Sequence, residues 1–224
     1  MDFNAMFQTW IKVLTKPGEP TFEEERHSPN ANLRTAIIWV VVAAAIAAVF
    51  SAIGAVIGGL LGFGSSSFME TIANQADLPP DVAAQMAAMS AGSVEGGAVS
   101  AFCLTLIVTP IGFLIGSGIY FLVAKLFGGT GSFEEQTYLL AAVAAPLTIV
   151  SGVIGIVPIL GGCISIIVSI YQLVLSYFAI KVSHNLTSGQ AIGVIIIPVV
   201  VILACVICGV VAISVLFASA MSGS

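Results

Sequence analysis

Five long stretches without a charged residue dominate the pattern of this chain. Each meets or approaches the roughly 20 apolar residues that a helix needs to cross the hydrocarbon core of a bilayer. They run from Thr35 to Leu61, Ser100 to Ala124, Thr137 to Val157, Gly162 to Ile180 and Ile192 to Phe217. They predict an all-α membrane bundle of five transmembrane helices, at about residues 35–61, 100–126, 137–157, 162–180 and 192–217. The membrane domain, residues 35–224, would follow a cytoplasmic N-terminal segment, residues 1–34.

The stretch from Thr137 to Ile180 is barely long enough for two crossings and a turn. Pro158, Gly161 and Gly162 interrupt it near its middle, where a tight outer hairpin is expected. The competing interpretation is a single kinked span with a re-entrant piece. That interpretation would leave four crossings and place Lys181 outside.

Charge predicts the orientation of the five spans. The mean hydropathy is +1.13, and only 8% of the residues are charged, against roughly a quarter in soluble domains. Five crossings place every base on the starting side, namely Lys12, Lys16, Arg26, Arg34, Lys125 and Lys181. The other side receives acids alone, namely Glu70, Asp77, Asp81 and Glu95. The positive-inside rule then predicts a cytoplasmic N-terminus and an outer C-terminus.

The N-terminal segment carries an amphipathic helical pattern. Apolar side chains recur at helical spacing at Phe3, Met6, Phe7, Trp10, Ile11 and Leu14. Such a helix commonly lies in the membrane interface, here with Phe3, Phe7 and Trp10 in the head-group boundary and with Lys12 and Lys16 near anionic lipid. The alternative is that the apolar stripe packs on the cytoplasmic ends of the spans.

Two further segments outside the spans have their own patterns. The acidic run from Glu23 to Glu25 is typical of a solvated linker. The outer segment from Ser65 to Val99 contains Pro79, Pro80 and Asp81, which suit a helix start. That segment is expected to cap the bundle or to rest on the outer leaflet.

Two cytoplasmic turns carry the sequence of a capping box. The pattern S-x-x-E begins at Ser132, and its form T-x-x-Q begins at Thr187. Glu134 and Glu135 are therefore explained by their place at the positive end of a helix dipole, without a catalytic role.

No Asp, Glu, Arg or His lies inside the spans, and Lys125 and Lys181 are placed at their cytoplasmic ends. Ion pumps and proton-coupled carriers usually need an ionisable side chain inside the membrane, so the sequence argues against a coupled transporter. Gln172, hydroxyls and tyrosines are the polar groups available within the spans. No cofactor or metal is expected, since no phosphate-binding loop or zinc spacing occurs.

Small residues are placed where helices could meet. Gly54, Gly58 and Gly62 form one ladder with four-residue spacing, and Gly112 and Gly116 form another. Both predict helix packing, either within the chain or in a dimer. Cys205 and Cys208 have C-x-x-C spacing, but within an apolar helix they are expected to be small packing residues.

Several stretches resemble the Yip (Ypt/Rab-interacting protein) domain family of integral membrane proteins, in its prokaryotic branch. They are the turn Gly128 to Phe133 followed by Tyr138 and Ala145-Pro146, the stretch Ile156 to Gly161, Tyr171, the stretch His184 to Ala191, and the N-terminal stretch Trp10 to Glu19. The resemblance implies five spans and a cytoplasmic N-terminus. Eukaryotic relatives are linked to Rab GTPases and membrane shaping, but their Asp-Leu-Tyr-Gly-Pro signature is missing here, so Rab binding is not implied.

The sequence favours a non-enzymatic protein that organises or shapes the membrane or scaffolds membrane proteins. The alternatives are a small channel or permease for an uncharged solute and an accessory subunit of a larger membrane complex. The expected partners are the lipid bilayer and membrane proteins or further copies of this chain, and no nucleic acid. The expected location is the plasma (inner) membrane of a prokaryote.

Overall fold

The part of this protein that the structure describes contains five helices long enough and apolar enough to cross a membrane. They are seen in a computed structural model that describes residues 3–63, 71 and 94–222. The five are α3 (Leu33–Leu60), α6 (Val94–Leu126), α7 (Phe133–Ile154), α8 (Pro158–His184) and α9 (Ser188–Ser222). The described residues contain no strand. The predicted all-α bundle with five spans is therefore confirmed.

The interrupted stretch forms two helices joined by a tight hairpin. Helix α7 ends at Ile154, and α8 begins at Pro158, whose missing N–H suits the first turn of a helix. Gly161 lies inside α8, where a Cβ atom would come within 2.6 Å of the Ile154 carbonyl oxygen. The hairpin therefore needs this glycine, and the single kinked span is wrong.

Helix ends were predicted less well than helix existence. Helix α6 begins at Val94, earlier than the expected start near residue 100. Helix α3 begins two residues before Thr35, because Asn32 caps it by accepting a hydrogen bond from the Thr35 N–H at 2.9 Å. The helix start expected at Pro79-Pro80-Asp81 lies outside the described residues.

Both predicted capping boxes are confirmed. Ser132 and Glu135 exchange side-chain to backbone hydrogen bonds at the start of α7. Thr187 and Gln190 do the same at the start of α9, with distances of 3.0 Å and 3.4 Å. Each box satisfies N–H groups that the first turn of a helix leaves without intrahelical partners.

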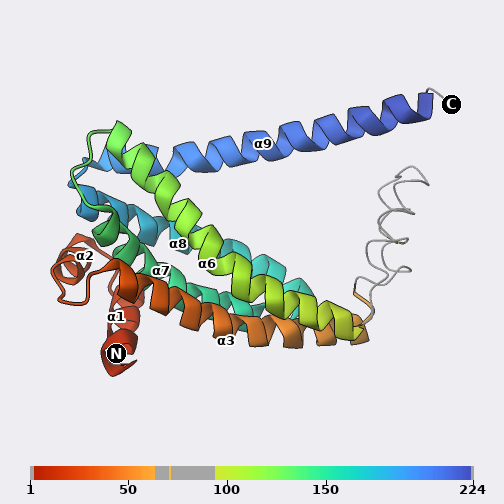
Figure 1. Ribbon diagram of the computed structural model, residues 1–224, viewed down its shortest axis with the longest axis horizontal. Helices are drawn as coiled ribbons and strands as arrows, with labels where there is room; N and C mark the ends of the chain where they lie inside the picture. The colour runs from red at the N-terminus through yellow and green to blue at the C-terminus, as the bar shows by residue number, and fades with distance from the viewer. Residues whose placement is uncertain (1–2, 64–70, 72–93, 223–224) are drawn as a thin grey trace.

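The buried core lies toward one end of the bundle. This end, where α3, α7 and α9 begin and where α6 and α8 terminate, is called the charged end below. Figure 1 shows the short helices α1 (Phe3–Thr15) and α2 (Glu19–Arg26) at this end, α6 running along α3, and α9 diverging from the other spans. Buried apolar side chains lie on α3 up to Ala48, on α7 up to Leu147 and on α8 from Leu175 onward.

Helix α9 contributes to the core only near its start. Ala191, Val194 and Ile195 are buried. From Val199 to Val211, every residue whose side chain the structure describes is exposed. The described side chains of α9 beyond Pro198 are therefore left to face lipid or another protein.

Glycines allow α3 and α7 to approach closely. A Cβ atom on Gly54 would lie 3.1 Å from the Gly155 carbonyl oxygen, and one on Gly152 would lie 3.1 Å from the Ala47 Cα. A Cβ on Gly58 would meet no atom within 4 Å. Gly62 follows the end of α3 with a φ of 78°, in the left-handed region that favours glycine. Of Gly54 and Gly58, only Gly54 makes a close contact with another described residue.

Gly54→Leu is accordingly expected to cost about 1–3 kcal/mol of stability, because the larger side chain would push α3 away from the hairpin that follows α7. Gly58→Leu is the matched control on the same helix and should cost less. Unfolding of both variants in detergent would measure the difference. A larger loss at Gly58 would contradict the packing described here.

Cysteine labelling in intact cells tests the orientation, starting from a variant in which Cys103, Cys163, Cys205 and Cys208 are replaced. Ser188→Cys, at the charged end, should react only with reagents that reach the cytoplasm. Val157→Cys, in the exposed α7–α8 hairpin, should react from outside. Reaction of both probes from the same side would contradict the prediction that α8, which lies between them, crosses the membrane.

Candidate functional site

Helix α1 lies crosswise against the spans near the charged end (Figure 1). Its residues Met6, Trp10 and Val13 are buried, with exposed fractions of 2%, 3% and 0%. The Trp10 ring meets Trp39 of α3 edge-on, with the centroids 6.0 Å apart. The Tyr171 hydroxyl of α8 donates a hydrogen bond to the Leu14 carbonyl oxygen. One face of α1 is therefore part of the protein core.

A second apolar face of α1 remains uncovered. Phe3, Phe7 and Ile11 follow one another at intervals of four residues, and their exposed fractions are 57%, 49% and 61%. The apolar stripe expected from the sequence is thus divided between the two proposed roles. Its buried part packs on the bundle and includes Trp10, while Phe3 and Phe7 stay free for the membrane interface.

A buried carboxylate joins α1 to α2 and α7. Glu25 is 7% exposed and receives hydrogen bonds from the Lys12 ammonium at 2.9 Å, the Thr9 hydroxyl at 3.3 Å and the Tyr138 hydroxyl at 3.4 Å. These three donors compensate for the cost of burying its charge. The expected solvated linker is therefore wrong for Glu25, although Glu23 and Glu24 are exposed.

The two basic residues of α1 and its end have different surroundings. Lys12 pairs with Glu24 at 2.7 Å and with Glu25 at 2.9 Å, so its ammonium is turned toward α2. Burial opposes the charge of Lys12, but the hydrogen bonds to the two glutamates raise its pKa above the usual value. Lys16 is exposed and has no ion pair among the described residues, so it alone stays available to anionic lipid.

Helix α2 is fixed to the end of α8. The Arg26 guanidinium donates hydrogen bonds to the Val182 carbonyl oxygen at 3.0 Å and to the Asn185 side chain at 3.1 Å. The Phe22 ring stacks on Phe178, with a centroid distance of 6.2 Å. Helix α2 is thus held on α8 by a polar contact and by an apolar one. Because Glu25 of α2 also binds Lys12 of α1, α2 helps to hold α1 on the spans.

A buried polar network ties α6, α7 and α8 together near the charged end. The Gln136 amide donates to the Ser117 carbonyl oxygen at 2.7 Å, and its oxygen lies 2.8 Å from His184 Nε2. Ser117 and Thr137 share a hydrogen bond of 2.8 Å between their hydroxyls. All four side chains are buried, so this network fixes how the three helices meet.

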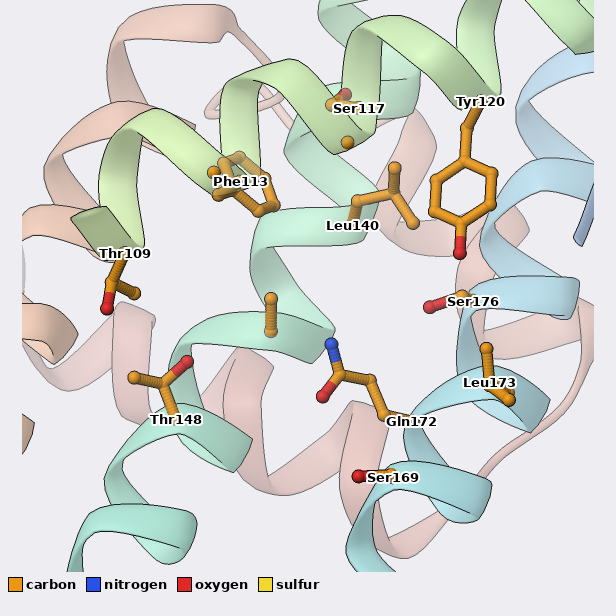
Figure 2. Close-up of a pocket in the computed structure, with 13 residues that line it drawn as sticks. Thr109, Phe113, Ser117, Tyr120, Leu140, Thr148, Ser169, Gln172, Leu173 and Ser176 are labelled. Carbon is orange, nitrogen blue, oxygen red and sulfur yellow. The ribbon is translucent and has the colours of Figure 1, made fainter. Parts of the chain in front are cut away.

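A cavity of about 460 Å³ lies between α6, α7 and α8, next to this network. Figure 2 shows side chains from all three helices directed toward it, with the Gln172 amide near its centre. Its lining includes Phe113 and Tyr120 of α6 and contains no charged residue. The sequence marked Gln172 only as one of the few polar residues within the spans and did not predict the cavity.

The second glycine ladder borders this cavity. Gly112 and Gly116 both line it, and a Cβ atom on either would meet no atom within 4 Å. Among the described residues, these glycines therefore leave open space instead of allowing helices to touch. Within the part of the chain that the structure describes, no contact supports their predicted role in helix packing.

The cysteines form no cluster. Cys103, Cys163, Cys205 and Cys208 are all free and exposed on the surface of the bundle. No group of three His, Cys, Asp or Glu residues that could hold a metal ion occurs among the described residues. The four thiols therefore face the surroundings of the spans, and Cys205 and Cys208 do not pack in the core as expected.

Replacing the buried carboxylate of Glu25 should weaken the attachment of α1 and α2 to the spans. Glu25→Gln is expected to cost about 1–3 kcal/mol, because charge-assisted hydrogen bonds from Lys12 and Tyr138 are weakened. Glu24→Gln removes an exposed partner of Lys12 and should cost no more than about 1 kcal/mol. Thermal unfolding and trypsin cleavage of the N-terminal segment would report both effects. Equal sensitivity of the two variants would contradict the role given to Glu25.

Comparison with known proteins was informative at the level of the family. The family model described as the Yip1 domain matches residues 11–209, nearly the whole chain. Neither the curated proteins nor the solved structures gave a match. The match confirms the resemblance inferred from the turns around residues 128–133 and 184–191. With its five apolar helices, this chain belongs to the Yip1 domain family and is a multi-pass membrane protein of a family without a known enzymatic role.

Proposed function

We propose that this protein is a non-enzymatic organiser of the membrane in which it is embedded. The observation that carries this proposal is the exposed apolar face of α1, formed by Phe3, Phe7 and Ile11 on a helix clamped crosswise to the spans. A helix in this position lies in the head-group boundary of one leaflet, where apolar side chains are favoured. The leaflet in question is the cytoplasmic one, by the positive-inside rule.

Because it is attached to the spans, α1 inserts into the leaflet at a fixed position and acts there as a wedge. Insertion of an exposed Phe or Ile side chain contributes up to about 1.5–3 kcal/mol. Because Glu25 and Arg26 hold α1 and α2 on the spans, the helix cannot leave the boundary while the spans remain in the membrane. The cytoplasmic leaflet must therefore make room for it, which favours a larger area on that side. This supports a role in shaping or organising the bilayer, in the plasma (inner) membrane of a prokaryote.

A scaffold for membrane proteins is the second form of this function. The observation that favours it is α9, whose described side chains beyond Pro198 are all exposed. An apolar helix that leaves its own bundle offers a long surface to a neighbouring membrane protein or to a second copy of the chain. Purification in a mild detergent distinguishes these partners. A stoichiometric foreign subunit would make the protein an accessory component of a larger complex.

Reconstitution into vesicles tests the wedge. The full-length protein in phosphatidylethanolamine and phosphatidylglycerol vesicles should reduce their diameter or form tubules. A variant combining Phe7→Ser and Ile11→Ser should lose about half or more of this effect, because the inserted apolar area is removed. The combination Phe7→Leu and Ile11→Leu keeps the apolar face and serves as the control.

Vesicle diameters from electron cryomicroscopy, at equal protein content, provide the measurement. Full shaping by the serine variant would exclude α1 as the working part. Loss in both variants would mean that ring packing, and not insertion of apolar surface, is what matters.

A further inference from the structure

We propose that the cavity between α6, α7 and α8 binds an uncharged lipid whose polar head carries ester carbonyl and hydroxyl groups, as a diacylglycerol does. The cavity measures about 460 Å³ and is separate from the exposed face of α1. Its binding function is independent of membrane shaping, so either proposal can fail without the other.

Polar side chains without partners point to a ligand. Among the residues that the structure describes, none forms a hydrogen bond with the side chains of Thr109, Tyr120, Thr148, Gln172 or Ser176. All five line the same cavity, and Figure 2 shows them converging on it from three helices. An amide or hydroxyl in apolar surroundings is costly unless it is hydrogen-bonded. Five such groups in one cavity favour an occupant that supplies the missing partners.

The cavity lies at the depth of the lipid chains. At a rise of about 1.5 Å per residue, its polar side chains lie roughly 9–26 Å below the charged ends of their helices. The hydrocarbon core is about 30 Å thick, so these positions are inside it. Gly112 and Ser169 on its rim are exposed, which places an opening between α6 and α8 on the membrane side of the bundle. The occupant therefore enters from the bilayer.

The lining chemistry selects the head group. No charged residue borders the cavity, so a phosphate or an ammonium group would be buried without a counter-ion. The Gln172 amide needs both an acceptor for its N–H groups and a donor for its oxygen. A glycerol head with ester carbonyls and one free hydroxyl offers both. An isoprenoid quinone offers acceptors alone and leaves the Gln172 oxygen without a donor.

Two glycines of α6 leave part of the cavity open. Gly112 and Gly116 lie on the wall of the cavity, and side chains built there would meet no atom within 4 Å of Cβ. Gly116→Leu should therefore fill part of the cavity without disturbing the backbone. Gly118 lies two residues further along α6, is not part of the lining and also has open space at its Cβ. Gly118→Leu is the matched control for bulk on α6.

The test measures binding of dioleoylglycerol to the full-length protein in nanodiscs of phosphatidylcholine, by native mass spectrometry at increasing lipid fractions. Gly116→Leu should weaken binding by about tenfold or more, and Gly118→Leu should leave it unchanged. Gln172→Leu should weaken binding by about tenfold as well, because the ligand loses both a donor and an acceptor. Without added lipid, Gln172→Leu should raise the melting temperature, since an unpaired amide is removed from apolar surroundings.

Two further probes test the class of the ligand. Decylubiquinone should bind more weakly than dioleoylglycerol, and dioleoylphosphatidylglycerol should show no binding that depends on Gly116. Absence of saturable dioleoylglycerol binding, or equal loss in the Gly116 and Gly118 variants, would overturn the proposal. Binding of the anionic lipid that Gly116→Leu abolishes would overturn the selection for an uncharged head. Each variant is first compared with the native protein by size-exclusion chromatography, so that misfolding is recognised.

Discussion

The burial of Glu25 is the interaction on which the charged end of this structure depends. Its carboxylate draws the Lys12 ammonium and the Tyr138 hydroxyl to one point, and so joins α1, α2 and α7. A buried charge is tolerated only with such partners, which is why α1 has one position instead of a range of them. With α1 fixed, its second apolar face stays exposed. In the function proposed above, this exposed face is the wedge, and its position then follows from an electrostatic requirement.

Polar pairing and apolar packing are both concentrated at the charged end. There the network of Gln136, Ser117 and His184 holds α6, α7 and α8 together, and most of the buried core lies beside it. Farther from this end fewer side chains are buried and α9 leaves the other spans, although Gly54 still holds α3 against the hairpin after α7. Lipid competes with side chains for apolar contacts, so burial is looser there. Both the cavity around Gln172 and the free length of α9 arise in this looser part.

Much of the architecture follows from one-dimensional patterns. Five uncharged stretches became five helices, because a chain in lipid has to satisfy its backbone hydrogen bonds within each helix. Pro158 marked the hairpin between α7 and α8, although the fourth span was expected to begin only at Gly162. The capping boxes at Ser132 and Thr187 were equally readable, since a cap is a contact over three residues. Local rules decide such features, so the sequence was enough for them.

Long-range contacts decided the rest. The sequence could not tell which of the acids Glu23 to Glu25 is buried, nor that Gly54 touches a neighbour while Gly116 faces a cavity. Both outcomes depend on which helix comes next to which, and small residues permit close packing without requiring it. By itself the sequence determined five spans, the capped starts of α7 and α9, and an amphipathic N-terminal helix. The tertiary structure alone divided that helix into a buried face and an exposed one, because its contacts with Trp39, Glu25 and Tyr171 fix its rotation.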